Sequence, residues 1–418
     1  MISGHLFLLR EFARRLWVRA ALISALAFVA PLAALPLASF LPDWVLAKIR
    51  EETVRSLLDI LANSMLAVTT FSLTIMVTAH LAADQAASPR GHRLLTEDGR
   101  TQTVLATFVG SFVYALMAIV LLQTGFATEA TYSGFYLMTL VVFAVVILTI
   151  LNWIGQLASL GSIEATIYAA EDCARAVLDN RNALPFLGGR RLIPGSVPSD
   201  AHSLASPNSG YIRHIDTARL SEFAGEHQGA VFIAAVPGDF VGRGDTLAHI
   251  SVDTFTDNDE KRLAAGFTIG GERSFDQDPI FALRVLTEIA ERALSPGIND
   301  PGTARDVAVR LALLVEDFSG ETEPDDPVAP LVHVPDLDRM NLLLQTVDPI
   351  ARDGRAFVEV QLDLQKALTR LARHRDTALA EAARAVSDRA LEYARIGLPI
   401  ESDFRRVADV APTSNPSN

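Results

Sequence analysis

Apolar residues gather in four long segments within the first 158 residues of the chain. These segments span residues 20–41, 63–82, 103–122 and 132–157. A helix rises about 1.5 Å per residue, so 20 residues reach about 30 Å, the thickness of a bilayer's hydrocarbon. The pattern therefore predicts a four-helix transmembrane domain over residues 1–158. A basic start before an apolar segment is also typical of a signal peptide, but 22 apolar residues favour a signal anchor.

The distribution of arginine and lysine predicts how the spans are oriented. Four arginines precede the first span and three lie between the second and third spans. The two segments expected on the opposite side hold three basic residues and none. Basic residues collect on the cytoplasmic side of membrane proteins. We therefore expect both termini of this multi-pass protein in the cytoplasm.

Residues 159–179 are predicted to continue the fourth span as a cytoplasmic helix. Apolar residues recur along it at steps of three and four: Leu160, Ile163, Ile167, Ala170, Ala174 and Val177. Such a seam is typical of a short coiled coil between subunits and also of a helix that packs on its own soluble domain. The seam is shorter than about three heptads, which favours the second interpretation. Residues 180–209 are rich in Asn, Pro, Gly and Ser and predict a linker, loosest at 201–209.

The remaining residues predict a cytoplasmic α+β domain. Residues 210–255 alternate short strand-like runs with turns, which indicates a small β-sandwich or barrel-like element. Its rhythm is similar to that of biotinyl and lipoyl carriers, but no lysine lies between Lys48 and Lys261, which excludes covalent carrier function. Residues 256–410 predict a helical bundle, with a short strand at 267–269 and helices over 257–265, 279–294, 301–315, 336–350, 356–374 and 376–393. Residues 411–418 predict a disordered tail.

Composition narrows the partners and the chemistry. A net charge of −13 without a basic stripe argues against nucleic acid as a partner. The single cysteine, Cys173, excludes an internal disulfide and a Cys-rich metal site. The sequence has no Gly-rich phosphate loop, no His-Glu-x-x-His motif and no nucleophile elbow. We therefore expect no enzyme activity, no catalytic residues, no cofactor and no metal.

Polar side chains within two spans form the first candidate site. The second span carries no charge, and a helical wheel places four of its polar residues on one face: Asn63, Thr70, Thr74 and Thr78. Such a face can line a water-filled path. More often, hydroxyls in membrane helices bond their own backbone and let helices pack closely. In the fourth span, Asn152 and Gln156 lie one turn apart and are candidates for a cytoplasmic mouth or for a bridge between helices.

The run SPGINDP at residues 295–301 predicts a tight corner between two helices. Gly297 permits a positive φ, Asn299 or Asp300 can cap the second helix, and Pro301 suits its first position. Capping alone accounts for most of these residue types. The functional alternative is contact with a ligand or another subunit through Ser295, Gly297, Asn299, Asp300 and Arg305. Arg305 also belongs to a predicted solvated or inter-subunit charge cluster with Arg284, Glu288, Glu291 and Arg292.

Three motifs in the chain resemble a known family. They are SMLAVTTFSLTIMVTAHLAADQAASPR at 64–90, TQTVLATFVGSFVYAL at 101–116 and ALSPGINDPGTA at 293–304. They are similar to motifs of an uncharacterised bacterial membrane-protein family, domain of unknown function 2254, and the similarity extends from Arg10 to about Leu391. The resemblance implies a protein of the bacterial inner membrane with a soluble C-terminal half. It implies no catalytic residues.

Two functions fit these observations. In the first, the spans of a homo-oligomer line a channel-like path for a small molecule or ion, which the cytoplasmic domain gates or assembles. In the second, the spans anchor a soluble domain that senses a ligand or scaffolds a partner without transport. No charge lies deep in any predicted span, which argues against a proton relay. The hydroxyl-rich face of the second span favours the first function.

Overall fold

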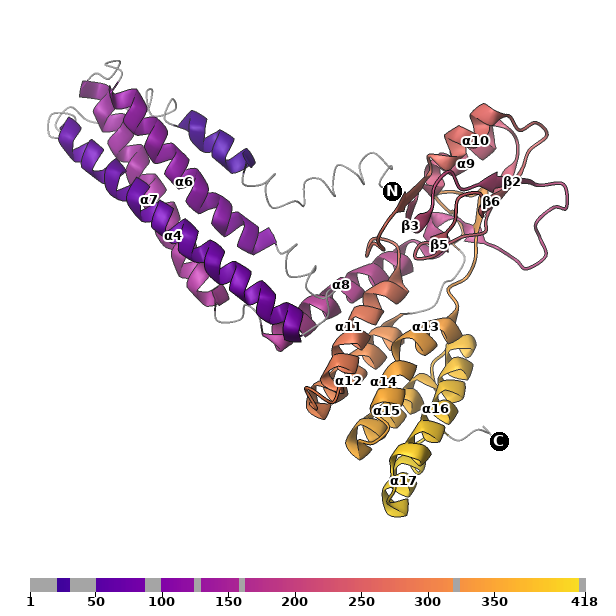
Figure 1. Cartoon of the computed structure of the whole chain (residues 1–418). Coiled ribbons are helices and arrows are strands. Elements are labelled where there is room, and N and C mark those ends of the chain that lie inside the picture. Colours follow the sequence, from indigo (N-terminus) through magenta and orange to yellow (C-terminus); the bar gives the residue numbers. More distant parts are fainter. Residues whose placement is uncertain are drawn as a thin grey trace. The chain divides into compact units, whose positions relative to one another are not determined.

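The chain divides into two compact units in the computed structural model (Figure 1). The structure describes residues 21–30, 50–86, 99–123, 129–157, 162–318 and 324–412. The membrane unit comprises Leu9–Gln85 and His92–Ala165, and the C-terminal unit consists chiefly of Thr166–Asn418. Each unit has its own hydrophobic core.

Three long helices lie side by side in the membrane unit: α4 (Glu51–Ala86), α6 (Gly99–Gln123) and α7 (Glu129–Leu157) (Figure 1). Their facing sides bury large side chains such as Phe108, Tyr114 and Phe135. The hydroxyls of Tyr114 on α6 and Thr139 on α7 lie 3.1 Å apart and join the two helices. Helix α4 contains no Gly or Pro and runs unbroken for 36 residues, about 54 Å at 1.5 Å per residue. It therefore begins well before residue 63, where the sequence predicted the span to start.

Three of these helical stretches are apolar and long enough to cross a membrane: Glu51–Ala79, Thr101–Gln123 and Tyr132–Gly155. They confirm apolar helices at the second, third and fourth predicted spans. A shorter apolar helix covers Ala21–Ala30, within the predicted first span at 20–41. The rest of that span lies outside the described residues, so a fourth crossing stays a prediction.

Helix α8 (Ile163–Ala183) carries the predicted seam from Ile163 onward and packs within the chain, while Leu160 lies outside the described residues. Its buried residues include Ile167, Ala170, Ala174 and Val177. From α8, Arg175 pairs with Asp317 at 3.1 Å, and Glu171 pairs with Arg310. Both partners lie on α12 (Pro301–Asp317). The seam therefore packs against the chain's own domain, as the second interpretation predicted.

The predicted linker at 180–209 is largely structured, which corrects that expectation. It contains the 3-10 turn η2 (Pro185–Gly188) and two strands, β1 (Arg190–Arg191) and β2 (His202–Ala205). Phe186 and Leu187 are buried in the core of the C-terminal unit, although both adopt positive φ. Strand β2 pairs antiparallel with β6, with His202 opposite Ile250. Strand β2 forms because it pairs with β6, which lies far along the chain, so the local composition did not predict a strand here.

The β-rich part of the C-terminal unit consists of two sheets. Its further strands are β3 (Gly210–Ile215), β4 (Ala230–Ile233), β5 (Phe240–Val241), β6 (Thr246–Ser251), β7 (Phe267–Gly270) and β8 (Val332–Val334). One sheet has the order β1-β8-β4-β6-β2 and the other β5-β3-β7. Two helices accompany them, α9 (Thr217–Glu226) and α10 (Asp257–Ala264). Strand β8 lies parallel to β4 and β1 and comes from a region predicted to be helical, so the sheets are not confined to residues 210–255.

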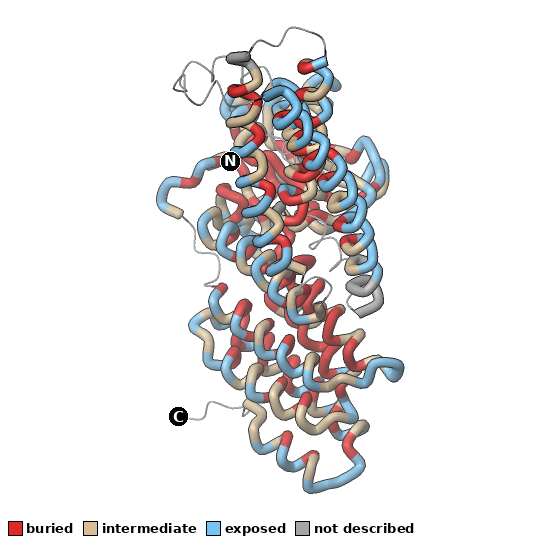
Figure 2. The backbone as a smooth tube through the Cα atoms, turned by 90° about the vertical axis from the view of Figure 1, so that its left-hand side faces the viewer, coloured by how far each residue is buried: buried red, intermediate tan, exposed pale blue. Residues whose placement is uncertain are grey.

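The rest of the C-terminal unit is helical. Besides α12 it contains α11 (Pro279–Ala293), α13 (Arg339–Thr346), α14 (Asp348–Asp353), α15 (Val358–Leu371), α16 (Thr377–Gly397) and α17 (Glu401–Ala408). Buried residues recur at each turn along such helices (Figure 2), as on α16 from Leu379 to Ala394. The helix predicted over 336–350 is two helices, because Val347 ends α13 and Pro349 lies at the start of α14. Helix α17 was not predicted.

Candidate functional site

One side of α4 packs against the rest of the membrane unit. Its buried residues recur at steps of three, four and seven: Val54, Leu58, Leu61, Met65, Ser72 and Met76. At about 100° per residue these positions form one stripe on the helix. The stripe contributes to the core shared with α6 and α7. This packing decides which side of α4 is left exposed.

The opposite side of α4 carries an exposed row of polar residues. This polar row consists of Glu52, Arg55, Asp59, Asn63, Thr70, Thr74 and Thr78, all exposed in the chain. At about 100° per residue the row lies roughly opposite the buried stripe and extends over about 39 Å. Asn63 and the three threonines therefore lie on the exposed side of α4, and three charged residues extend this row toward the start of the helix.

Helix α7 shows what an exposed lipid-facing side of this unit looks like. Its exposed residues include many large apolar side chains, besides the exposed Asn152: Leu140, Val141, Val145, Ile147, Leu148, Leu151 and Ile154. A helix side in contact with hydrocarbon is expected to be apolar, because an unpaired polar group in lipid is costly. The exposed side of α4 is mixed, because exposed Leu66, Val77 and Leu81 are interspersed with the polar residues of the row. A row of polar residues therefore distinguishes this side from the exposed side of α7.

The threonine hydroxyls of the polar row donate to their own helix backbone. Thr74 Oγ1 donates to the carbonyl oxygen of Thr70 and Thr78 Oγ1 to that of Thr74, both at 2.9 Å. Thr70 Oγ1 donates to the carbonyl oxygen of Leu66 at 2.5 Å. This self-bonding was the alternative weighed from the sequence, and it is present. Since each hydroxyl has one hydrogen, the outward-facing oxygens still hold lone pairs that can accept.

A surface hollow marks the polar end of the row. It has a volume of about 550 Å³ and is lined by residues of the first turns of α4, including Glu52, Arg55, Asp59 and Asn63. Within the described part of the chain, these four side chains make no ion pair or hydrogen bond. The sequence analysis missed Glu52, Arg55 and Asp59 as site residues. These residues are spaced three and four apart, and no Gly or Pro separates them from Asn63. This pattern could have predicted that they continue the same helix face.

The polar candidates of the fourth span lie on α7. Asn152 is exposed, and its neighbour Trp153 is buried. Gln156 belongs to the same helix, but its side chain lies outside the described residues. No contact joins Asn152 to the polar row among the residues that the structure describes. Its role at a mouth or a helix bridge stays a prediction.

The SPGINDP corner joins α11 to α12 through hydrogen bonds within the chain. Asp300 caps α12, because its Oδ1 accepts from the Thr303 backbone N–H at 3.1 Å and its Oδ2 from the Thr303 hydroxyl at 2.6 Å. These hydrogen bonds from Thr303 lower the pKa of the Asp300 carboxyl. Ser295 Oγ donates to the Arg292 carbonyl at 2.6 Å. The predicted capping role of Asp300 is confirmed.

The positive φ at the corner belongs to Asn299 and not to Gly297, which corrects the sequence prediction. Asn299 has φ 54°, while Gly297 is outside the positive-φ region and has open space around it. Asn tolerates this conformation better than other non-glycine residues. The tip of the corner is exposed, with Ile298 at 42%. Contact of this tip with a ligand or subunit stays a prediction.

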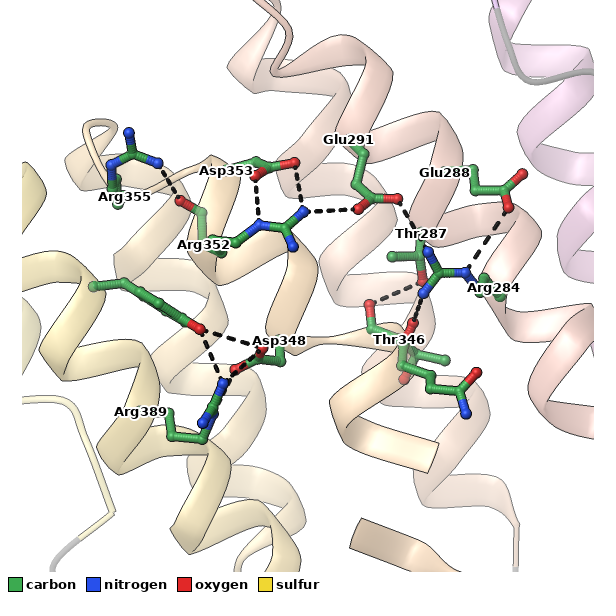
Figure 3. Close-up of polar contacts among 12 residues, drawn as sticks. Arg284, Thr287, Glu288, Glu291, Thr346, Asp348, Arg352, Asp353, Arg355 and Arg389 are labelled. Atoms are coloured by element: carbon green, nitrogen blue, oxygen red, sulfur yellow. Dashed lines mark hydrogen bonds and ion pairs between the residues drawn. The ribbon is translucent and has the colours of Figure 1, made fainter. Parts of the chain in front are cut away.

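Several charged residues of the predicted cluster pair within the chain, and Figure 3 draws the pairs around Arg284 and Arg352. Arg305 Nε donates to Asp363 Oδ2 on α15 at 2.7 Å. Arg352 bridges Glu291 at 3.2 Å and Asp353 at 2.8 Å, and Arg284 donates to the Gln345 carbonyl oxygen at 2.9 Å.

These pairs tie α11, α12, α14 and α15 together. Burial, more than any neighbouring charge, raises the pKa of the Glu291 carboxyl. The cluster predicted as solvated or inter-subunit therefore joins helices of one chain. Among the described residues, no group of three or more His, Cys, Asp and Glu side chains could hold a metal ion.

Comparisons with known proteins support membrane association. A family model described as "Predicted membrane protein (DUF2254)" matches residues 13–370. An uncharacterized protein of Mycobacterium tuberculosis (strain CDC 1551 / Oshkosh) is 34% identical over 138 residues, which cover 32% of this chain and 26% of that protein. An uncharacterized protein of Mycobacterium bovis is 33% identical over the same shares. The chain thus spans about a quarter of the length of these relatives. No solved structure matches the chain significantly.

Proposed function

The chain belongs to the DUF2254 family of predicted membrane proteins, and from that premise we propose that it forms a homo-oligomeric, channel-like assembly. In this assembly the polar row of α4 lines a path for a small solute or ion. The observation that carries the proposal is the position of the row, exposed and opposite the packed side of an apolar helix. In a lone chain, Asn63 and the threonines would face lipid. Copies arranged around an axis would turn them toward water.

The chemistry of the row favours cations and neutral solutes over anions. The threonine hydrogens are engaged with backbone carbonyls, so acceptor oxygens face outward. Acceptor oxygens replace the hydration shell of a cation but offer nothing to an anion. At the polar end, the Glu52 and Asp59 carboxylates outnumber the Arg55 guanidinium.

The remaining features of the proposal concern placement and control. We place the protein in the bacterial inner membrane with both termini in the cytoplasm, following the distribution of arginines. The C-terminal unit then gates or assembles the path. The alternative is a membrane-anchored sensor or scaffold without transport. The internal pairing of the corner's charges supplies no partner-binding group that would favour this alternative.

Ion flux through the purified full-length protein in liposomes tests the proposal. We expect K⁺ flux above that of empty liposomes and a loss of about tenfold or more in Thr74→Leu, because a branched apolar side chain replaces an acceptor in the narrow part of a water path. The flux of Cl⁻ is expected to stay low.

The matched control is Thr149→Leu on α7. The Thr149 hydroxyl also donates to its own helix, to the Val145 carbonyl oxygen at 2.7 Å, but it lies outside the polar row. We expect this variant to conduct like the wild type. An intact oligomer without flux of K⁺ or small neutral solutes would favour the anchor alternative.

A further inference from the structure

A basic hollow lies on the C-terminal unit beyond the end of α15. It has a volume of about 560 Å³, and its lining includes four basic residues and one carboxylate: Lys366, Arg370, Arg373, Arg375 and Glu316. The chain has 36 Lys and Arg among 418 residues, about one in twelve, and a net charge of −13. With four basic residues, the segment 366–375 is positively charged, although the net charge of the chain is negative.

Two of the four positive charges have no partner among the residues that the structure describes. Arg370 Nε pairs with Glu316 at 2.5 Å, and Lys366 Nζ pairs with Asp363 at 3.2 Å. The guanidinium groups of Arg373 and Arg375 make no ion pair or hydrogen bond with any residue that the structure describes, and both residues are exposed. The hollow therefore offers two free bidentate donors beside two paired cations.

The wall of the hollow is held in place by hydrogen bonds. His374 Nδ1 accepts from the Asp376 backbone N–H at 3.0 Å, which leaves the proton on Nε2, 3.1 Å from the Glu316 carbonyl oxygen. Thr369 Oγ1 donates to the Val410 carbonyl oxygen at 2.7 Å. The His374 bond connects the segment after α15 to Glu316 on α12, and the Thr369 bond connects α15 to Val410, which follows α17. Thr369 and His374, which line the hollow, are therefore held by bonds within the chain.

Helix electrostatics do not explain Arg375, one of the two free arginines. Cations stabilise the C-terminal end of a helix, which accounts for Arg370 in the last turn of α15. Arg375 instead directly precedes Asp376, the N-cap of the 21-residue helix α16. The N-terminal end of a helix carries positive potential, so a cation there is unfavourable. An anion bound in the hollow would relieve this repulsion and be attracted by the same potential.

We propose that this hollow binds a phosphate-bearing anion, with Arg373 and Arg375 as the principal contacts. The planar guanidinium group matches two phosphate oxygens at once, and more than one such group suits a ligand with several charges. Two sources share this chemistry: a free polyphosphate such as a nucleotide, and the headgroup of an anionic phospholipid. The inference does not depend on a solute path in the membrane unit.

Calorimetric titration of the full-length protein in neutral detergent with inorganic tripolyphosphate tests the inference. We expect binding that weakens as salt is raised, since exposed charges are screened. The Arg373→Gln/Arg375→Gln variant is expected to lose about tenfold or more in affinity, because each charged hydrogen bond contributes at least about that factor. Arg373→Lys/Arg375→Lys keeps the charges but not the fork geometry, so an intermediate affinity is expected.

The matched control is Arg405→Gln/Arg406→Gln on α17, which removes two exposed arginines outside the hollow. We expect it to bind like the wild type. Displacement of tripolyphosphate by phosphatidylglycerol micelles, but not by phosphatidylcholine micelles, would assign the site to a lipid headgroup, and a lack of displacement to a soluble anion. The inference is overturned if tripolyphosphate does not bind, or if both glutamine double variants lose affinity equally.

Discussion

The polar face of α4 at Asn63, Thr70, Thr74 and Thr78 and the SPGINDP corner were both candidate sites in the sequence, and the structure separates them. At the corner, Asp300 and Ser295 form hydrogen bonds within the chain, and the nearby Arg305 forms an ion pair. Along α4, the charged and amide side chains of the row have no partner among the described residues, and the whole row is exposed. The polar residues at the corner bond within the chain, so their role in the fold accounts for them. The exposed polar residues of α4 are instead the feature on which the proposed path rests.

The largest effect, on membrane insertion, is expected when an aspartate is placed on the apolar exposed side of α7. The comparison is an aspartate on the polar row of α4. Val145→Asp puts a charge on the apolar exposed side of α7 and is expected to cost about 3 kcal/mol of insertion free energy. Thr74→Asp puts the same charge on the polar row, where a water path would solvate it at little cost. The amount of full-length protein inserted in membranes measures both. If Thr74→Asp loses as much inserted protein as Val145→Asp, the row faces lipid.

A smaller effect is expected when the cap of the corner is removed. Asp300→Ala leaves the Thr303 backbone N–H without its partner, and we expect a loss of about 1 kcal/mol in unfolding free energy of the C-terminal unit. Thermal unfolding followed by circular dichroism measures it. An Asp300→Ala protein as stable as the wild type would contradict the structural role of the corner.

The same cap is expected to depend on pH. The hydrogen bonds from Thr303 lower the pKa of Asp300 below its ordinary value of 3.8. A carboxyl with a lowered folded-state pKa contributes its stability above the unfolded-state pKa and loses it as pH falls through the folded-state pKa. Asp300→Asn caps without titrating, so the stability difference between wild type and this variant should shrink in that acidic range. A difference that is constant with pH would mean that the Asp300 charge is not used.

The smallest effect concerns the two residues at the tip of the corner. Gly297→Ala meets open space and no positive φ, so we expect a change within about 0.5 kcal/mol. Asn299→Ala forces alanine into the left-handed region and is expected to cost about 1 kcal/mol. Melting temperatures of the two variants decide which position carries the turn. The reverse order of stabilities would restore the original expectation for Gly297.

The sequence alone determined features that depend on a residue's own neighbours. Apolar length predicted the helices α6 and α7 and most of α4, because crossing a bilayer needs about 20 apolar residues whatever the tertiary fold. Asp300 and Pro301 predicted where α12 begins, because a cap acts on amides three residues away. The shared face of Asn63 and the threonines followed from helical periodicity in the same way.

Only the tertiary structure decided which groups meet over long distances in the chain. Strands β2 and β8 exist through partners far along the sequence, so a segment predicted as a linker and a short stretch just before the predicted helix at 336–350 both form sheet. The pairing of Arg305 with Asp363 likewise depends on how α12 and α15 pack. Packing of α4 against its neighbours left the polar row outward, because the buried stripe on the other side of the helix supplies the apolar surface that the core needs.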